Sequence, residues 1–124
     1  KYTEKQIRKM ISGEGGIVSY LGTNSFMDVE NRVNAGDPEA ILINEAFAYQ
    51  LAKEIGAMST VVEGKVDAII ITGGIAYNKD LMEIVKRKVQ FIAPVSIYPG
   101  EDEMGALAGN GLAILNGTEE VKVY

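Results

Sequence analysis

The spacing of apolar positions changes several times along the chain, and each change predicts a new element. The clearest run follows Asp37-Pro38 and steps by three or four residues, which is typical of a long helix with one buried face. Asp at the cap and Pro at the first helical position favour a helix start, because Asp accepts from free N–H groups and Pro loses no hydrogen bond. We expect one face of this helix to be buried, formed by Ala40, Ile43, Phe47, Leu51, Ile55, Met58 and Val62.

Helical spacing also occurs at both ends of the chain. Thr3 followed by Gln6 forms a capping-box pattern, and the predicted helix ends at Gly13. A final helix is expected from about Asp102 to Leu115, where Asn116-Gly117 supplies the stop signal. The side chains of this last helix that we expect to point inward are Met104, Leu107, Leu112 and Leu115.

The middle of the chain predicts a strand, a helix and a second strand. Val66 to Thr72 is apolar on both faces, which predicts a central strand of a parallel sheet. A helix follows over Leu81 to Val89, and Ala93 to Tyr98 predicts the second strand. Elements of these lengths form a βαβ unit, which should be right-handed. Ile17 to Leu21 is also apolar, and its length leaves an edge strand and a buried loop equally open.

The predicted sheet is thin for an independent α/β domain. Two strands are well indicated and Ile17 to Leu21 could supply a third, whereas four or more are usual. We therefore expect that either another chain or further upstream residues complete the sheet. Lys1 in place of Met fits the second explanation without proving it.

Composition and charge narrow the possible chemistry. The 124 residues fit one compact domain, and their 17 acidic and 12 basic residues give a net charge of −5. Because the basic residues are scattered, a nucleic-acid partner is not expected. The chain has no Cys and no His, which excludes thiolate nucleophiles, Cys-based zinc sites and imidazole catalysis within it. Without a long apolar span or a signal peptide, we expect a cytoplasmic location and no membrane partner.

Candidate chemistry concentrates at the glycine turn after the first predicted strand, Thr72-Gly73-Gly74-Ile75. In an open parallel sheet, the ligand crevice forms at the carboxyl ends of the strands. Glycines let a planar ligand or a phosphate lie against the peptide, and the following helix directs N–H groups to the same place. An ordinary tight turn is the alternative. No Walker-type lysine follows any glycine loop, which excludes a P-loop protein.

A longer set of motifs resembles the butyrate kinases in order and spacing, through essentially the whole chain. The segments that carry the resemblance are Gly22-Thr23-Asn24, residues 66–77 (VDAIIITGGIAY), residues 91–95 (FIAPV) and residues 98–103 (YPGEDE). The likeness corresponds to about the last third of a butyrate kinase. That family is similar to acetate kinase and belongs to the acetate and sugar kinase, Hsp70 and actin superfamily.

The resemblance implies an α/β fold, namely the C-terminal portion of an actin/Hsp70-like ATPase domain of the ribonuclease H-like type. Its βαβ core would be flanked by helices and its sheet would be incomplete. Residues 1–124 would form a single domain, the C-terminal nucleotide-binding domain fragment of a two-domain acyl kinase with ATP in the cleft between the domains. In that fold each domain begins with three strands, so their absence here would account for the thin sheet.

The resemblance also implies ATP-dependent phosphorylation of butyrate, or of a related short- or branched-chain carboxylate, to an acyl phosphate and ADP. The residues expected around ATP or ADP are Thr72, Gly73, Gly74, Ile75 and Asn78 on one side, and Gly22, Thr23 and Asn24 on the other. Many relatives carry an acidic residue and an arginine after the second segment, where this chain has Ser25-Phe26-Met27. The resemblance therefore does not extend to polar contacts from those positions. The family's catalytic residues have no matching segment here.

The acidic segment Glu101-Asp102-Glu103 opens the final predicted helix. The resemblance to acetate kinase implies that Asp102 or Glu103 orients Mg²⁺ through its water shell, as a hard cation with phosphate partners requires. The helix dipole also favours carboxylates at a solvated N-terminus, so a plain helix start is the alternative.

Two other functions stay open at this point. The chain could be an interaction or dimerisation domain of such a kinase without activity on its own, because Gly105, Gly109 and Ala113 allow close helix packing. We favour packing within the domain for these residues. The chain could also be a related superfamily ATP-binding protein that makes no acyl phosphate. In the intact protein we expect a homo-oligomer, and we expect the pocket that sets acyl-chain preference to lie outside this chain.

Overall fold

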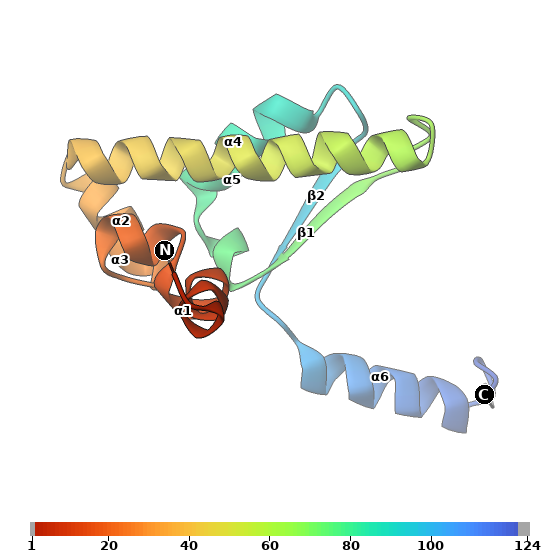
Figure 1. Cartoon of the computed structure of the whole chain (residues 1–124). Coiled ribbons are helices and arrows are strands. Elements are labelled where there is room, and N and C mark those ends of the chain that lie inside the picture. The colour runs from red at the N-terminus through yellow and green to blue at the C-terminus, as the bar shows by residue number, and fades with distance from the viewer. Residues whose placement is uncertain (1, 122–124) are drawn as a thin grey trace.

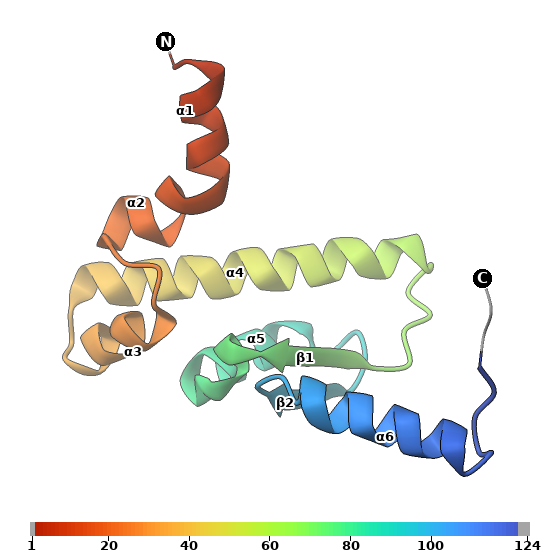
Figure 2. The ribbon, with the colours of Figure 1, turned by 90° about the horizontal axis from the view of Figure 1, so that it is seen from below.

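A mixed α/β arrangement is seen in the computed structural model, which describes residues 2–121 (Figure 1). The elements run in the order α1 (Glu4–Lys9), the π-helical segment η1 (Met10–Glu14), α2 (Ile17–Leu21), α3 (Phe26–Asn34), α4 (Pro38–Val61), β1 (Ile69–Gly73), the 3-10 segment η2 (Gly74–Tyr77), α5 (Lys79–Val89), β2 (Val95–Pro99) and α6 (Glu103–Leu115). Seen from below, α1 extends away from the rest (Figure 2).

Helix α4 connects the two packed parts of the structure. Its start is as predicted: Asp37 Oδ1 accepts hydrogen bonds from the N–H groups of Glu39 and Ala40 at 3.0 and 3.3 Å, and Pro38 is the first helical residue. The helix has 24 residues and spans about 36 Å. The predicted stripe is buried or half-buried as far as Ile55, but Met58 and Val62 are exposed. These last two residues line the mouth of an open apolar cavity with Ile55, Ser59, Val66, Ile69 and Ile92.

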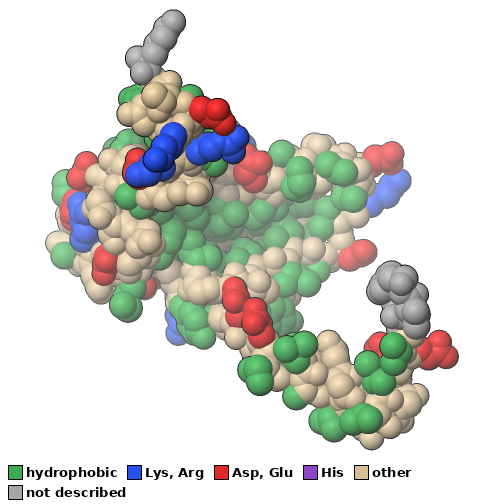
Figure 3. Space-filling view, turned by 60° about the horizontal axis from the view of Figure 1, so that its bottom comes forward, with side chains coloured by type: hydrophobic (Ala, Val, Ile, Leu, Met, Phe, Trp, Pro, Cys, Tyr) green, Lys and Arg blue, Asp and Glu red, His purple; other side chains and the backbone are tan. Residues whose placement is uncertain are grey.

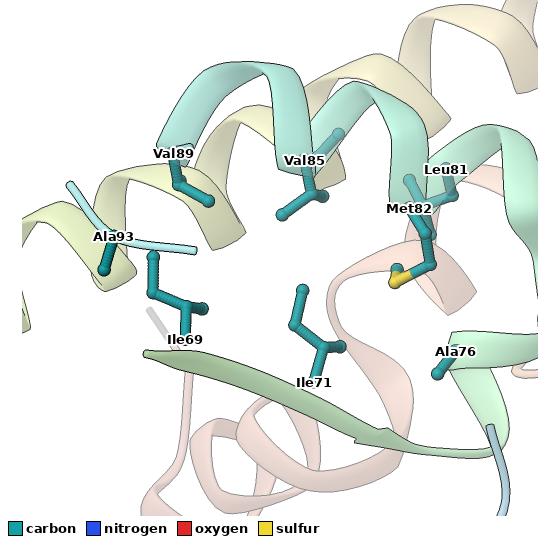
Figure 4. Close-up of a cluster of buried hydrophobic side chains, with 9 residues drawn as sticks. Ile69, Ile71, Ala76, Leu81, Met82, Val85, Val89 and Ala93 are labelled. Carbon is teal, nitrogen blue, oxygen red and sulfur yellow. The ribbon is translucent and has the colours of Figure 1, made fainter. Parts of the chain in front are cut away.

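The larger hydrophobic cluster lies between α5, α4 and one face of β1. Met82, Val85 and Val89 of α5 point toward Ile69 and Ile71 of β1 (Figure 4), and Leu81 of α5 belongs to the same cluster. All six side chains are buried, and Phe47, Leu51 and Ile55 of α4 pack against the same cluster. This packing confirms the predicted helix after the first strand.

A smaller cluster lies at the N-terminal end of α4. Leu21 of α2, Val29 of α3 and Ala40 of α4 are its buried members, with Ile17, Val33 and Ile43 packed around them. Ile17 to Leu21 therefore forms a helix, and our expectation of an edge strand or buried loop was wrong. In this helix Ile17 and Leu21, four residues apart, lie one turn apart on the face that packs in the cluster.

The two strands pair in parallel, as predicted, in a register that runs from Ile69 opposite Val95 to Gly73 opposite Pro99. The strand begins later than expected, at Ile69 instead of Val66. Only one face of the strand is covered. On the other face, Ile70 keeps 65% of its surface exposed. The prediction of a central strand buried on both faces is thus wrong for the described chain, where α4 and α5 lie on a single side of the sheet.

Helix α6 projects away from the strands as a separate arm (Figures 1 and 3). Asn116-Gly117 ends it as predicted: Gly117 has φ 69°, and the N–H of Thr118 donates to the carbonyl of Ala113 at 2.9 Å. Our expectation that its apolar side chains point inward was wrong. No described element packs on this helix, so the four apolar side chains are exposed, up to 82% for Leu115. They are Met104, Leu107, Leu112 and Leu115.

The described helices include no segment that is both long and apolar enough to cross a lipid bilayer.

Candidate nucleotide site

The glycine turn after β1 is built from a positive-φ glycine, a short 3-10 segment and a capped helix. Gly73 has φ 87°, a value that L side chains rarely adopt, and this conformation redirects the chain into η2. Asn78 then caps α5, since its Oδ1 accepts a hydrogen bond from the N–H of Leu81 at 2.9 Å. Asn78 is only 5% exposed, so this hydrogen bond fixes both the turn and the start of the helix.

A second turn, at the end of β2, is fastened to the first. The N–H of Gly73 donates to the carbonyl of Gly100 at 3.2 Å, and the N–H of Gly100 donates to the carbonyl of Gly73 at 3.0 Å. Gly100 has φ 86°, and a Cβ there would lie 2.5 Å from the Tyr77 hydroxyl oxygen. The carboxyl ends of both strands therefore meet at one place, where Gly73 and Gly100 both have positive φ values that L side chains rarely adopt.

The loop Gly22-Thr23-Asn24 lies between α2 and α3. Gly22 ends α2 with φ 71°. The Thr23 hydroxyl donates to Asp28 Oδ2 at 2.8 Å and accepts from the N–H of Ser25 at 3.1 Å, while Ser25 Oγ accepts from the N–H of Asp28 at 3.3 Å. These hydrogen bonds fix the loop against the first turn of α3.

A cavity of about 280 Å³ lies between α3 and the glycine turn, and we call it the site cavity. One wall comes from α3 and the other from η2 and the cap of α5. The lining residues are Phe26, Met27, Glu30, Gly74, Ile75, Tyr77 and Asn78. The structure thus brings the helix that follows the Gly22 loop to the turn that follows β1, although some fifty residues separate them in the sequence.

The expected site residues divide into two groups by their place around this cavity. Gly74, Ile75 and Asn78 line it directly. The other five flank it through the loop before α3 or through the end of β1: Gly22, Thr23, Asn24, Thr72 and Gly73. The wall formed by α3 is held by the Phe26 ring, whose centroid lies 4.7 Å from that of Phe47 on α4 in an edge-to-face contact.

Four lining residues had no role assigned from the sequence. Phe26, Met27 and Glu30 belong to helix α3, which was not predicted, and Tyr77 ends η2. The signal for α3 was present. Ser25 followed three residues later by Asp28 is a capping pattern, and the Ser25 side chain does cap this helix. Recognising that pattern would have placed Phe26 and Glu30 one turn apart on the same helical face.

The acidic segment after β2 is divided between two structural roles. Asp102 caps α6, because its Oδ1 accepts from the N–H of Gly105 at 2.9 Å. Glu101 instead reaches the glycine turn: a methyl group placed on Gly73 would lie 3.8 Å from Glu101 Oε1. Within residues 2–121, no three acidic side chains gather closely enough to hold a metal ion by themselves. One or two carboxylates suffice for Mg²⁺ when phosphates and water supply the other ligands, so the donors fit that arrangement.

Comparison with known proteins identifies the family. The model of the Acetokinase family matches residues 1–118. The chain belongs to the acetokinase family. Among similar proteins, this acetokinase-family chain is 54% identical over 124 residues to butyrate kinase 2 of Clostridium acetobutylicum. It is 52% identical over the same length to a probable butyrate kinase 2 of Caldanaerobacter subterraneus subsp. tengcongensis and to butyrate kinase 1 of Clostridium acetobutylicum.

These matches cover 100% of the acetokinase-family chain and 35% of each relative. The chain therefore spans about a third of the length of the relatives it matches. Both walls of the site cavity lie inside the matched region, since they extend from residue 26 to residue 78.

Proposed function

We propose that this chain forms the adenosine-side wall of the active-site cleft in a butyrate kinase. The observation that carries the proposal is the 52–54% identity to proteins named butyrate kinases over all 124 residues, which include both walls of the site cavity. In this proposal residues 1–124 are one domain, the C-terminal nucleotide-binding part of a two-domain enzyme with an actin/Hsp70-like, ribonuclease H-like fold. ATP and a short-chain carboxylate are its substrates, and the intact protein is a homo-oligomer.

The proposed reaction transfers the γ-phosphoryl group of ATP to a carboxylate. A carboxylate oxygen forms a bond to the γ-phosphorus, the bond from that phosphorus to the β–γ bridging oxygen breaks, and ADP leaves with the electron pair. Mg²⁺ would neutralise charge on the phosphates when it is bound. Here Gly74 and Ile75 would give the nucleoside a flat wall, Asn78 would add amide hydrogen bonds, and Asp102 or Glu103, together with Glu101, would hold the hydrated metal.

The experiment that tests this function is hydroxamate formation by the full-length protein that carries this sequence. With ATP, Mg²⁺ and hydroxylamine, we expect product with butyrate and a smaller yield with acetate. We expect the isolated 124-residue chain to be inactive, because one wall of a cleft cannot align two substrates or exclude water. A full-length protein that binds ATP but yields no hydroxamate with any short carboxylate would contradict the proposal and favour a related ATP-binding protein.

A second candidate function is an interface between copies of the enzyme, and the exposure of α6 favours it. Apolar side chains extend along this arm (Figure 3). A Cβ on Gly109 would meet no atom within 4 Å, so this position leaves room for a partner helix. Gly105 has another explanation, since a Cβ there would collide with the Asp102 carboxylate that caps the helix. If α6 is such an interface, Gly109→Leu should abolish the oligomer of the full-length protein. Light scattering, which measures the mass of the assembly, tests this expectation.

A further inference from the structure

We propose that Glu30 selects the ribose of the bound nucleotide by accepting hydrogen bonds from its 2′- and 3′-hydroxyl groups. This inference deepens the proposed function and rests on it, because it assumes that the site cavity holds a nucleoside. It assigns a specificity-determining role to a residue of α3 that neither the resemblance nor the comparisons single out.

The first support is the chemistry of the cavity wall. Phe26, Met27, Ile75 and Tyr77 offer apolar and aromatic surface, and Gly74 leaves one side open because a Cβ there would meet no atom within 4 Å. Glu30 is the charged member of this lining. A carboxylate and one amide, Asn78, among mostly apolar side chains are typical of a ligand pocket, where a few polar groups fix the orientation of the ligand.

The second support is that Glu30 is not used by the rest of the described structure. Its neighbours on α3 are paired: Asp28 bonds to Thr23, and Arg32 bonds to Asp37 at 2.7 Å. Glu30 is half-buried, and between residues 2 and 121 it forms neither a side-chain hydrogen bond nor an ion pair. Partial burial of an unpaired carboxylate is unfavourable, so a ligand that donates to it is bound more tightly.

The third support is the fit between donors and acceptors. A carboxylate is an acceptor only, with two oxygens, and the ribose diol offers two O–H donors. The adenine edge instead presents a donor beside an acceptor, which an amide matches. Across the cavity from Glu30, Asn78 provides that amide: its Oδ1 is bonded to the N–H of Leu81, and its Nδ2 carries two further donors. A carboxylate would also repel the phosphates, which places it at the ribose rather than along the phosphate chain.

The test is calorimetric titration of the full-length protein with ADP, 2′-deoxy-ADP, 3′-deoxy-ADP and inosine diphosphate. We expect the wild type to bind ADP more tightly than either deoxy analogue. In Glu30→Ala, affinity for ADP should fall by about 10- to 100-fold while affinity for the deoxy analogues changes little, so that the ribose preference disappears. Glu30→Gln should keep part of the preference because its amide oxygen still accepts.

The matched control is Glu54→Ala, which removes an exposed carboxylate of α4 that lines none of the described cavities. This variant should titrate like the wild type. An equal loss for ADP and both deoxy analogues in Glu30→Ala would overturn the role in ribose selection. The role in ribose selection would also be overturned if Glu30→Ala lost the preference for ADP over inosine diphosphate but kept the ribose preference. A folded wild type that binds no ADP would overturn the proposed function itself, whereas ADP binding without ribose preference would overturn only the role of Glu30.

Discussion

Two adjacent glycines in the turn after β1 serve different purposes, although the sequence presents them as one motif. Gly73 has φ 87° and is bonded to Gly100, so its role is conformational. Gly74 lies outside the left-handed region, and a Cβ there would meet no atom within 4 Å. Its absent side chain therefore leaves space in the site cavity instead of permitting a special backbone conformation.

This difference predicts that the same substitution affects ligand binding at one position and stability at the other. Gly74→Val should weaken ADP binding by the full-length protein at least tenfold, because the side chain fills the cavity, while the free energy of unfolding changes by less than about 1 kcal/mol. Gly73→Val should cost roughly 1–2 kcal/mol in stability, because valine is forced into a left-handed conformation. Calorimetry and urea unfolding measure the two effects. Normal ADP affinity in a folded Gly74→Val protein would show that the glycine pair is a plain turn.

The acidic segment supports a second prediction at the residue scale, because amide variants separate helix capping from metal binding. Asn caps helices about as well as Asp, so Asp102→Asn should keep the hydrogen bond to Gly105 and the melting temperature. If Asp102 holds hydrated Mg²⁺, the variant should nevertheless need more Mg²⁺ and turn over more slowly. Glu101→Gln and Glu103→Gln make the comparison complete. Three variants with normal turnover and normal Mg²⁺ dependence would reduce the segment to a solvated helix start.

At the scale of elements, the N-terminus of α4 links α3 to α4 through one carboxylate. The hydrogen bond from Arg32 Nε to Asp37 Oδ2, at 2.7 Å, is the main cause that lowers the pKa of Asp37 below its usual value of 3.8. Backbone N–H groups of Ala40 and Glu39 lower this pKa further. Arg32 Nη1 also donates to the carbonyl of Leu21 at 3.1 Å, so the same guanidinium holds the end of α2.

This arrangement predicts a loss of stability in acid. Because the folded pKa is the lower one, the charged carboxylate stabilises the fold above the usual value near 3.8, and this contribution disappears as the pH falls through the lowered value. Asp37→Asn should therefore be less stable than the wild type at neutral pH, and the difference should shrink as the pH falls below 3.8 and through the lowered pKa. Urea unfolding from neutral to acidic pH measures this difference, and Glu54→Gln, which changes an exposed carboxylate of α4 away from Arg32, is the control. A constant difference at all pH values would contradict the assignment.

The elements that the sequence predicted correctly are those whose signals are local. Asp37-Pro38 began α4 and Thr3 with Gln6 began α1, because caps act within one turn. The segment Ile17–Leu21 was assigned wrongly, since five residues are too few for periodicity to separate a strand from a helix. The residues that line the site cavity were predicted on one side only, because the loop Gly22-Thr23-Asn24, expected on the other side, flanks the cavity. Gly74, Ile75 and Asn78 follow a strand, whereas the opposite wall depends on how α3 packs on α4 through Phe26 and Phe47.

At the scale of the whole molecule, apolar side chains are exposed in several places, among them the open face of the sheet and the length of α6. Ile70 is 65% exposed, and Tyr98 and Leu107 are similarly uncovered. Large exposed apolar areas mark surfaces that are covered by another part of a protein or by a partner. The proposed function supplies such a cover, because the matched relatives are about three times as long as this chain.

This exposure predicts the behaviour of the isolated 124-residue chain. It should self-associate and bind a hydrophobic dye strongly, and the full-length protein should bind much less dye for each copy. Leu107→Lys combined with Leu115→Lys should reduce both effects in the isolated chain. Leu42→Lys, on an exposed part of α4, is the control and should change them less. Light scattering and dye fluorescence measure the outcome, and a monomeric isolated chain without dye binding would contradict it.

The paired hydrogen bonds between Gly73 and Gly100 have a consequence for the exchange of amide hydrogens with solvent. Each glycine donates to the carbonyl of the other, at 3.2 and 3.0 Å, so an opening that separates the two turns exposes both amides at once. Exchange through such an opening proceeds from one shared open state, and the two protection factors should therefore be equal. A ligand that bridges the ends of β1 and β2 would slow both exchange rates by the same factor, even if it contacts only one of the glycines.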